Sequence, residues 1–573
     1  MFSHIYFKFI GSLMVFKLPF YFLTTTKKGN LHMSKLNKTV KNSYQDKSHK
    51  NFMNGDSWDI SDCFMKLRIV AASSFFGEPM YYNAHGNEEK HYSYTRIDSE
   101  ELSYIEKFLG KHIISPSPSD CDSFPIQESI EQIIDDCLDK DVEKTLQIAV
   151  ELRNEDMIRA TPQVILVRAA MHKNSKGTGL IGKYIDKICV RGDEPAAGLS
   201  YLIVKYGKET PIPNALKKGW KKVLESFNDY VISKYRMENN FVKTRDVVNL
   251  VHAYSDSINK LMNGNAKQEN TWNNIVSNAN KEEKSNKEIW TDALKGMPHM
   301  ALLRNLRNLY NAGVDFNMYN QKLIDGVEKG KQLPFRYYSA FKALKGAGIE
   351  DPKMHDLLET CLEESFKNAP HFNGKVVCLS DNSGSAWCTL TSELGSMHVA
   401  EIGNMMSVAT AKMADEGYVG AFGDELSMMP IRKKDSMLTQ VNELTKLGKN
   451  VGGGTENGIW LFFDHAIKNK EHYDHIFVYS DMQCGHGGLY GNDGEVAEEF
   501  VWEGKGWNSY INVPKLINKY RSEVNPNVMV YLIQTAGYKD VLVPECFNRT
   551  FILGGWSQNI PAYAAKMSKI FNN

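Results

Sequence analysis

The sequence lacks the features by which several protein classes are recognised. Its nine cysteines are scattered without a C-x-x-C pair, which argues against a disulfide scaffold or a zinc site and favours a reducing compartment, so we expect a cytoplasmic protein. Lysine plus arginine and aspartate plus glutamate both number 68, so no global positive field can attract nucleic acid. No strict internal repeat is found, and the period of any helical array therefore cannot be read from the chain.

Long apolar runs are also scarce, and the one near the N-terminus is imperfect. Residues 5–23 are apolar and aromatic but are interrupted by Lys8 and Lys17, and no small-residue cleavage site follows them. A stretch rich in lysine, asparagine and serine continues to residue 51. We therefore expect residues 1–53 to be a leader outside the folded domains, with the true start at Met33, and we expect no association with membranes.

What is present indicates a large globular protein. At 573 residues, with 42% hydrophobic and 24% charged residues, the chain is too long for one ordinary core, and two or three domains are expected. Residues 161–250 hold 16 Lys and Arg against 8 Asp and Glu, whereas residues 119–143 hold nine acids and one lysine. The basic block can bind phosphates by Coulomb attraction and counterion release, but it could equally be a set of solvated helix faces.

The patterning divides the chain at about residue 370. Residues 54–370 are a succession of amphipathic helices broken by Gly and Pro, with a polar loop expected at 263–287, which predicts an α-solenoid of stacked helix pairs. Residues 371–573 alternate strands with helices, which predicts a doubly wound parallel sheet. The expected strands are 376–379, 417–422, 475–479 and 528–533, and the expected helices are 400–413, 437–447 and 458–469. Functional loops of such sheets lie at the carboxyl ends of the strands.

Oxygen ligands for a divalent cation occur at these strand ends. Asp381, Ser383 and Ser385 form a D-x-S-x-S sequence directly after the first strand, Thr455 follows a triple glycine, and Asp481 ends the strand IFVYS. Carboxylate and hydroxyl oxygens are hard ligands that suit Mg²⁺. We expect these five residues to hold a divalent metal, with one coordination position open to an acidic group of a partner. The same residues could instead stabilise turns.

This set resembles the metal-ion-dependent adhesion site of von Willebrand factor A domains, with all five positions present. Two enzyme interpretations fail on the residues themselves. A phosphatase of the aspartyl-phosphate type requires a second aspartate where Ser383 stands, and a hydrolase nucleophile elbow requires glycine two places before its serine, where Asp381 stands before Ser383 and Ser383 before Ser385. No acid–base pair or nucleophile constellation occurs elsewhere, so we expect no enzyme.

The helical half resembles the TROVE domain. Residues 290–309, WTDALKGMPHMALLRNLRNL, are similar to the run close to MP-x-x-ALLRNL that marks this family. Residues 334–343 are similar to its next helix, and residues 58–82 to its opening. A TROVE domain followed by a von Willebrand factor A domain is the order of the Ro ribonucleoproteins, and from residue 54 onward the chain is identified as a member of that family.

The resemblance implies a fold of the α plus α/β class, in which a ring of HEAT-like helical pairs at 54–370 is closed by the A domain at 371–573. It implies RNA binding for RNA quality control, with small structured, Y-like RNAs on the outer basic surface and the single-stranded 3′ ends of misfolded noncoding RNAs in the central hole. In bacteria it implies a partner exoribonuclease. We expect a monomer.

The family also suggests which residues contact RNA. Its RNA-contacting segment is a basic helix–loop–helix that ends in a histidine, which corresponds here to residues 233–252, although one residue is inserted and a basic stretch is replaced between Arg236 and Lys243. The expected RNA contacts are Lys217, Lys218, Lys221, Lys234, Arg236, Lys243, Arg245 and His252. The lysines and arginines would contact phosphates. His252 could stack on an unpaired base or, alternatively, be a buried core histidine.

The lysines of the preceding helix add a further argument. Lys217 lies four residues before Lys221, and Lys218 four before Lys222, so each pair shares a helix face. Such like-charge pairs disfavour the helix, and a phosphate partner would explain them.

Two other functions stay open. The metal site could bind an acidic residue of a protein, which would make the chain a metal-dependent, adhesion-type interaction module on a helical scaffold. Such a module would not need the basic block at 168–245. A metal-dependent hydrolase would cleave RNA that is incubated with Mg²⁺.

Overall fold

The structure of the protein is a computed structural model. It describes residues 48–50, 56–73, 126–265, 271–277, 284–388, 397–483 and 512–572, apart from 238–239, 241, 331, 455–457, 538–539 and 545–546. The chain divides into two units, residues 1–49 and 50–573, and nearly all described residues belong to the second. The leader expected at 1–53 lies almost entirely outside the described residues.

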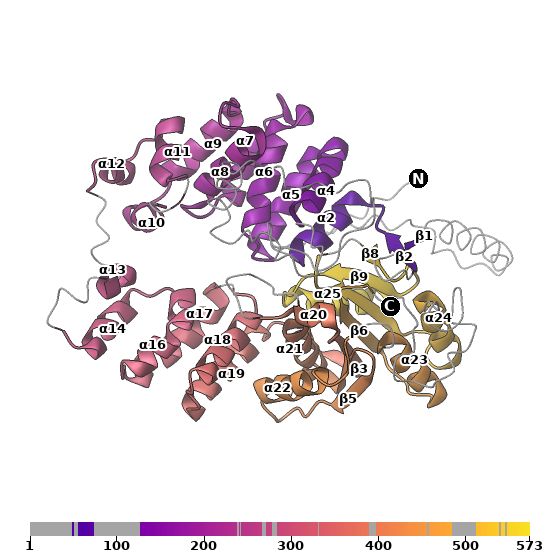
Figure 1. The fold of residues 1–573 in the computed structure, drawn as a ribbon. Coiled ribbons are helices and arrows are strands. Elements are labelled where there is room, and N and C mark those ends of the chain that lie inside the picture. Colours follow the sequence, from indigo (N-terminus) through magenta and orange to yellow (C-terminus); the bar gives the residue numbers. More distant parts are fainter. Residues whose placement is uncertain are drawn as a thin grey trace. The chain divides into compact units, whose positions relative to one another are not determined.

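The described residues from 63 to 365 are almost all helical (Figure 1). The α-helices are α2 Cys63–Ala72, α4 Ile126–Lys140, α5 Val142–Asn154, α6 Ala160–Met171, α7 Leu180–Ile188, α8 Glu194–Tyr206, α9 Asn214–Glu225, α10 Asp229–Lys234, α11 Thr244–Val251, α12 Asp256–Met262, α13 Trp272–Ser277, α14 Asn286–Lys295, α15 His299–Arg304, α16 Leu306–Asn311, α17 Asn320–Gly330, α18 Phe335–Gly346 and α19 Pro352–Ser365. Two 3₁₀ turns are η2 Lys173–Ser175 and η4 Phe316–Met318. Neighbours pack side by side, such as α5 with α6, α6 with α8 and α17 with α19, as expected for stacked helices.

Local capping signals fix where these helices begin. At α14 the Glu288 N–H donates to Ser285 Oγ at 3.3 Å, and the Ser285 N–H donates back to the Glu288 carboxylate at 2.9 Å. This reciprocal capping box satisfies two backbone donors that the helix itself cannot. It ends the polar stretch expected at 263–287, which in its described part also contains the unexpected helix α13. Trp272 and Ile275 of α13 pack against the neighbouring core, which explains why the stretch is not all loop.

Two cores lie within the helical region. Apolar side chains of α2 and α4 to α12 form the first, in which Trp220 is completely buried. The helices α14 to α19 share the second core with one face of the sheet domain. At that junction the rings of Phe335 on α18 and Trp556 lie 6.0 Å apart, edge to face.

The sheet domain contains six strands in the order β5-β4-β3-β6-β7-β9. They are β3 Phe372–Asp381, β4 Ala414–Phe422, β5 Leu426–Pro430, β6 His475–Ser480, β7 Met529–Gln534 and β9 Thr550–Gly554. All neighbours are parallel except β4 and β5, which are antiparallel. The four expected strands are confirmed, whereas the edge strands β5 and β9 were not expected.

Helices cover both faces of this sheet. They are α20 Gly384–Cys388, α21 Val399–Lys412, α22 Met437–Gly448, α23 Gly458–Lys468, α24 Val513–Glu523 and α25 Asn559–Asn572. Side chains of α21, α22 and α25 contribute to the core on one face, and those of α23 and α24 to the core on the other. The fold class is therefore α plus α/β, as expected.

A short strand joins the start of the helical region to the sheet domain. Strand β2 Asp56–Asp59 pairs antiparallel with β8 Asp540–Val541, and Ser57 Oγ donates to the Val541 carbonyl at 2.9 Å. A third short strand, β1, spans Ser48–Lys50. Among the described residues, no helix is long and apolar enough to cross a membrane.

Candidate metal centre and nucleic-acid interface

Strands β3 and β6 bring the two expected carboxylate ligands to one edge of the sheet. The strands are parallel neighbours in which Ser380 lies opposite Tyr479, so Asp381 and Asp481 lie at the same carboxyl edge, where ligands of such sheets bind. Both residues are buried, with exposed fractions of 3% and 2%. Asp381 and Asp481 therefore lie at the same edge of the sheet, as the alternation of strands and helices in the sequence predicted.

Hydrogen bonds connect four of the five expected ligands. The Ser383 N–H donates to Asp381 Oδ1 at 2.9 Å, the Oγ atoms of Ser383 and Ser385 lie 3.1 Å apart, and Ser385 Oγ donates to Asp481 Oδ2 at 2.7 Å. Ser480, which sequence reasoning missed, donates from Oγ to Asp381 Oδ2 at 2.6 Å. The oxygens thus converge on one small, buried place.

The fifth expected ligand, Thr455, lies outside the described residues. The glycine loop before it does reach the D-x-S-x-S turn, because the Gly384 N–H donates to the Gly453 carbonyl at 2.7 Å. Asp424 holds this loop, accepting from the N–H groups of Gly453 and Gly454 at 2.9 and 3.1 Å. Three loops therefore meet at the site.

The electrostatics of the site suit a cation. Burial raises the pKa of Asp381 and of Asp481, and the neighbouring charge of Asp381 raises the pKa of Asp481 further. Within the described part of the chain neither carboxylate forms an ion pair. Two buried carboxylates without a positive partner are costly, and a bound cation would remove that cost. Hard oxygen donors of this kind fit Mg²⁺, and Asp381, Ser383, Ser385 and Asp481 would hold it.

The site is not a dense cluster of acids. In the described residues no group of three or more His, Cys, Asp or Glu side chains could hold a metal ion, because half of this donor set consists of serine hydroxyls. Mg²⁺ tolerates so few carboxylates since it keeps several of its waters.

A buried amide network supports the metal-site loop from behind. Asn382 and Asn404 exchange side-chain hydrogen bonds of 2.9 and 3.0 Å, and Asn404 Nδ2 also donates to Thr445 Oγ1 at 3.3 Å. Gly448 is closely apposed, since a Cβ there would lie 2.0 Å from Asn382 Oδ1. Sequence reasoning missed this network because its members lie on three separate elements.

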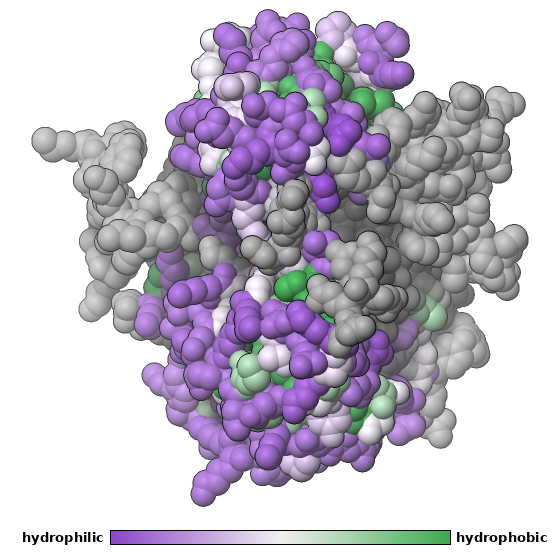
Figure 2. All heavy atoms as spheres, turned by 90° about the vertical axis from the view of Figure 1, so that its left-hand side faces the viewer, coloured by the Kyte–Doolittle hydropathy of each residue, from purple (hydrophilic) through white to green (hydrophobic). Residues whose placement is uncertain are grey.

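The expected RNA contacts lie on α9, α10 and α11, in the connection between the last two, and, for His252, directly after α11. Helix α9 packs against α11, and α10 against α12, so these elements are neighbours. Over its described residues the face that includes α11 and α12 is largely hydrophilic (Figure 2). The described part of this face is therefore mainly polar.

The lysines of α9 differ in their surroundings. Lys221 pairs with Glu225 at 3.8 Å, and Lys222 pairs with Asp186 at 2.9 Å. Lys217 and Lys218 form no ion pair with any described residue. The acids thus relieve part of the like-charge repulsion for which a phosphate partner was inferred from the sequence. Within the described part of the chain, Lys217 and Lys218 have no acid that does so.

The residues after α9 present cations and a histidine. The Lys234 Nζ lies 5.4 Å from the ring centre of Tyr230 and 5.3 Å from that of Tyr235. Arg236 is half-buried, and its Nε has no hydrogen-bond partner among the described residues. Lys243 is half-buried, Arg245 is exposed, and His252, which ends α11 at a φ of 54°, is exposed. The alternative interpretation of His252 as a core residue is therefore wrong.

Two exposed tyrosines belong to the same surface and were missed from the sequence. The exposed fraction is 44% for Tyr230 and 70% for Tyr254. The Tyr254 N–H donates to Glu225 Oε1 at 2.9 Å, which places it beside the end of α9. Exposed aromatic rings are platforms on which unpaired bases stack, but their exposure cannot be read from the sequence.

Comparisons with known proteins agree with this architecture. Residues 260–355 match the TROVE domain family, and the match contains the 290–309 segment. The structure is similar to the crystal structure of the RO (RSR) protein of Deinococcus radiodurans, with a TM-score of 0.53 and 12% sequence identity over 89% of this chain and 100% of that chain. At that identity the likeness concerns the fold.

Proposed function

We propose that this chain, a TROVE-domain protein of the Ro type, is an RNA-binding component of a ribonucleoprotein. Proteins of this type bind RNA and are not enzymes, in agreement with the expectation that this chain catalyses no reaction. The observation that carries the proposal is the surface of α9 to α12, which combines exposed tyrosines with lysines that have no acidic partner among the described residues. Lys217, Lys218 and Lys234 would neutralise phosphates, and Tyr230 and Tyr254 would stack on unpaired bases.

The proposal extends to the kind of RNA. We infer that small structured, Y-like RNAs and the single-stranded 3′ ends of misfolded noncoding RNAs are the ligands, bound by a cytoplasmic monomer for RNA quality control, with an exoribonuclease as a partner. A surface that joins cations with stacking platforms favours RNA with unpaired segments, because bases in a duplex offer no free faces.

The proposal also includes binding of Mg²⁺ at the candidate metal site. Asp381, Ser383, Ser385 and Asp481, with Thr455, would hold Mg²⁺. The ion would supply a coordination position for an acidic group of a partner, and the serine hydroxyls and the amide network behind them would keep the loop in place. This arrangement also supports a second function, an adhesion-type module that binds an acidic residue of a protein.

A gel-shift titration of the full chain tests RNA binding. Structured RNA with a single-stranded 3′ tail is compared with the same RNA without the tail, using the wild type and Lys217→Ala/Lys218→Ala/Lys234→Ala. We expect tighter binding of the tailed RNA and weaker binding by the variant. The control, Lys433→Ala/Lys434→Ala/Lys569→Ala, removes three exposed lysines of the sheet domain. If no RNA binds, the adhesion-type function is favoured.

A further inference from the structure

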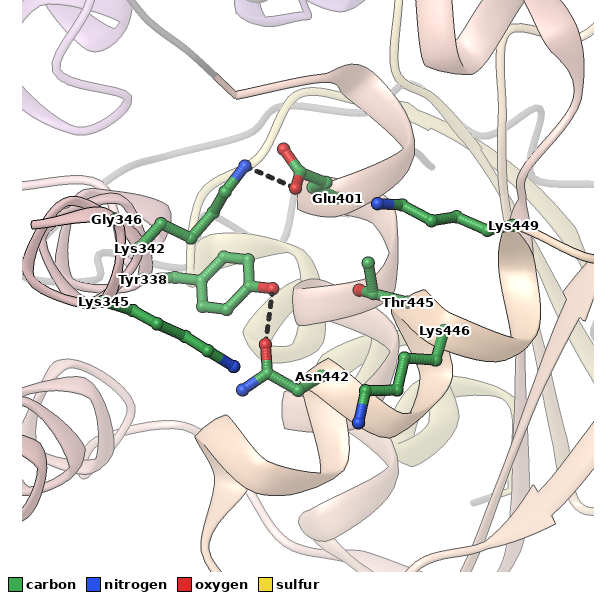
Figure 3. A pocket seen from close by; sticks show the side chains of 9 residues that line it. All are labelled: Tyr338, Lys342, Lys345, Gly346, Glu401, Asn442, Thr445, Lys446 and Lys449. Atoms are coloured by element: carbon green, nitrogen blue, oxygen red, sulfur yellow. Dashed lines mark hydrogen bonds and ion pairs between the residues drawn. The ribbon is translucent and has the colours of Figure 1, made fainter. Parts of the chain in front are cut away.

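A second group of lysines surrounds a pocket between α18 and the sheet-domain helices α21 and α22 (Figure 3). The pocket has a volume of about 310 Å³. Its lining residues are Tyr338, Lys342, Lys345, Gly346, Glu401, Asn442, Thr445, Lys446 and Lys449. Four of the nine are lysines and one is an acid, so the lining has an excess of three positive charges, although the whole chain is neutral.

The single acid of the pocket is already neutralised. Glu401 accepts a hydrogen bond of 2.5 Å from Lys342 Nζ at one oxygen and one of 3.1 Å from the His398 N–H at the other. Lys345, Lys446 and Lys449 are exposed, and none of them forms an ion pair with a described residue. Among the described residues, the charge of these three lysines therefore has no acidic partner.

The floor of the pocket adds hydrogen-bonding capacity. Tyr338 Oη donates to Asn442 Oδ1 at 3.2 Å, which fixes the amide so that its nitrogen turns toward the side where Lys345 lies (Figure 3). The Asn442 amide N–H groups form no hydrogen bond with a described residue. Lys449 lies 5.4 Å from the ring centre of Trp387. Ammonium groups and an amide donor thus surround the pocket (Figure 3). They come from α18, from α22 and from Lys449, which follows α22.

Helix stability explains these lysines only in part. Lys345 lies in the last turn of α18 and Lys446 in the last turn of α22, where a positive charge interacts favourably with the helix dipole. That interaction would be satisfied by lysines pointing anywhere into solvent. It does not explain why the ends of α18 and α22 line the same pocket. In that arrangement their lysines repel each other.

We propose that this pocket is a phosphate-binding site that takes a di- or triphosphate group. Several ammonium donors around a small, open pocket recognise a compact group with several negative charges as point charges, as lysine does in other phosphate sites. Such a group can come from a free polyphosphate or from the phosphorylated end of an RNA. Only the second source depends on the proposed RNA binding, so the site can be tested separately.

Isothermal titration calorimetry of the full chain with inorganic tripolyphosphate tests the site. Divalent metal is removed beforehand, so that the ligand cannot bind at the metal site. The wild type should bind with a Kd below about 1 mM. Lys345→Gln/Lys446→Gln/Lys449→Gln should bind about tenfold or more weakly, because charge-assisted hydrogen bonds are lost. The same three positions changed to arginine should retain binding.

Two matched variants locate the binding. Lys433→Gln/Lys434→Gln/Lys569→Gln removes the same charge from other exposed positions, and Lys217→Ala/Lys218→Ala/Lys234→Ala removes it from the α9 to α11 surface. Both should bind tripolyphosphate as the wild type does. The proposal is overturned if the wild type does not bind, or if the pocket variant, folded by circular dichroism, binds equally well.

A second arm identifies the source of the phosphate. An RNA oligonucleotide with a 5′-triphosphate is compared with the same oligonucleotide ending in a 5′-hydroxyl. A tighter complex of the triphosphate form that the pocket variant loses assigns the site to an RNA end. Equal binding of the two RNAs, together with tripolyphosphate binding in the pocket, assigns it to a free polyphosphate.

Discussion

The candidate metal centre and the surface of α9 to α12, which we call the basic surface, are built in opposite ways. At the candidate metal centre four oxygen-bearing side chains are buried, and a chain of hydrogen bonds links the four residues. On the basic surface the long side chains of Lys217, Lys218 and Lys234 lie at or near solvent and have no acid partner in the described part of the chain. The proposed Mg²⁺ site would select one small ion by geometry, whereas the proposed RNA-binding surface would hold a large, variable ligand mainly by charge.

The largest effect is expected where one of the four hydrogen-bonded residues of the candidate metal centre is replaced. Asp381→Ala removes a carboxylate from the metal centre, so Mg²⁺ affinity should fall by about a hundredfold or more. RNA affinity should stay within about twofold, since the lysines of the basic surface do not depend on the metal loop. Calorimetry with Mg²⁺ and a gel shift measure the two. Complete loss of RNA binding by the folded variant would contradict the separation of the two sites.

The matched variant Asp381→Asn sharpens this prediction. It keeps the shape of the side chain and removes one of two buried like charges. Without metal, its melting temperature should be equal to or higher than that of the wild type, because two buried carboxylates no longer repel each other. A lower melting temperature in metal-free buffer would mean that repulsion between the two carboxylates does not destabilise the metal-free protein.

On the basic surface the expected change is a change of slope. Each lysine that contacts a phosphate releases a counterion, which makes the negative slope of log K against log salt steeper. The triple variant Lys217→Ala/Lys218→Ala/Lys234→Ala should therefore reduce the magnitude of this slope by about 2. Gel shifts at four salt concentrations give this slope. The same slope in the variant and the wild type would remove these lysines from the interface.

A smaller effect is expected at the support of the metal loop. Asn404→Leu breaks the exchange of hydrogen bonds with Asn382 without touching an expected ligand. Mg²⁺ affinity should fall about tenfold, as it does when residues behind a metal ligand are lost. Asn450→Ala, which only removes a bond to the Lys446 carbonyl, serves as the control. An affinity equal to that of the wild type would show that the loop holds its geometry unaided.

Counted per pH unit, the smallest effect concerns the pH dependence of stability. Burial lowers the pKa of His475 on β6 to about 4, below the ordinary value of about 6.5. Folding therefore favours the neutral ring, and its contribution is complete above pH 6.5 and is lost as the pH falls toward 4. As the pH falls through this range, the unfolding free energy of His475→Phe should decrease less than that of the wild type, by about 1 kcal/mol per pH unit. Urea unfolding at several pH values measures it, and the same pH dependence in His475→Phe and the wild type would contradict it.

The same contrast explains how much could be predicted from the sequence. Buried strands such as β3 and β6 contain continuous apolar runs, so their position and the convergence of Asp381 and Asp481 follow from the pattern. The edge strands β5 and β9 were missed because most of their residues are not buried. Asn404 and Tyr254 were missed because nothing in the local pattern tells a buried asparagine from an exposed one, or a stacking tyrosine from one in the core.

Photo-crosslinking of RNA to the full chain tests the central claim most directly. Structured RNA carrying 4-thiouridine in its single-stranded 3′ tail is bound, irradiated and digested, and the crosslinked peptides are identified by mass spectrometry. We expect crosslinks within residues 226–255, which contain Tyr230 and Tyr254, and their loss in Tyr230→Leu/Tyr254→Leu. Crosslinks confined to residues 371–573 would contradict the account and place the RNA on the sheet domain.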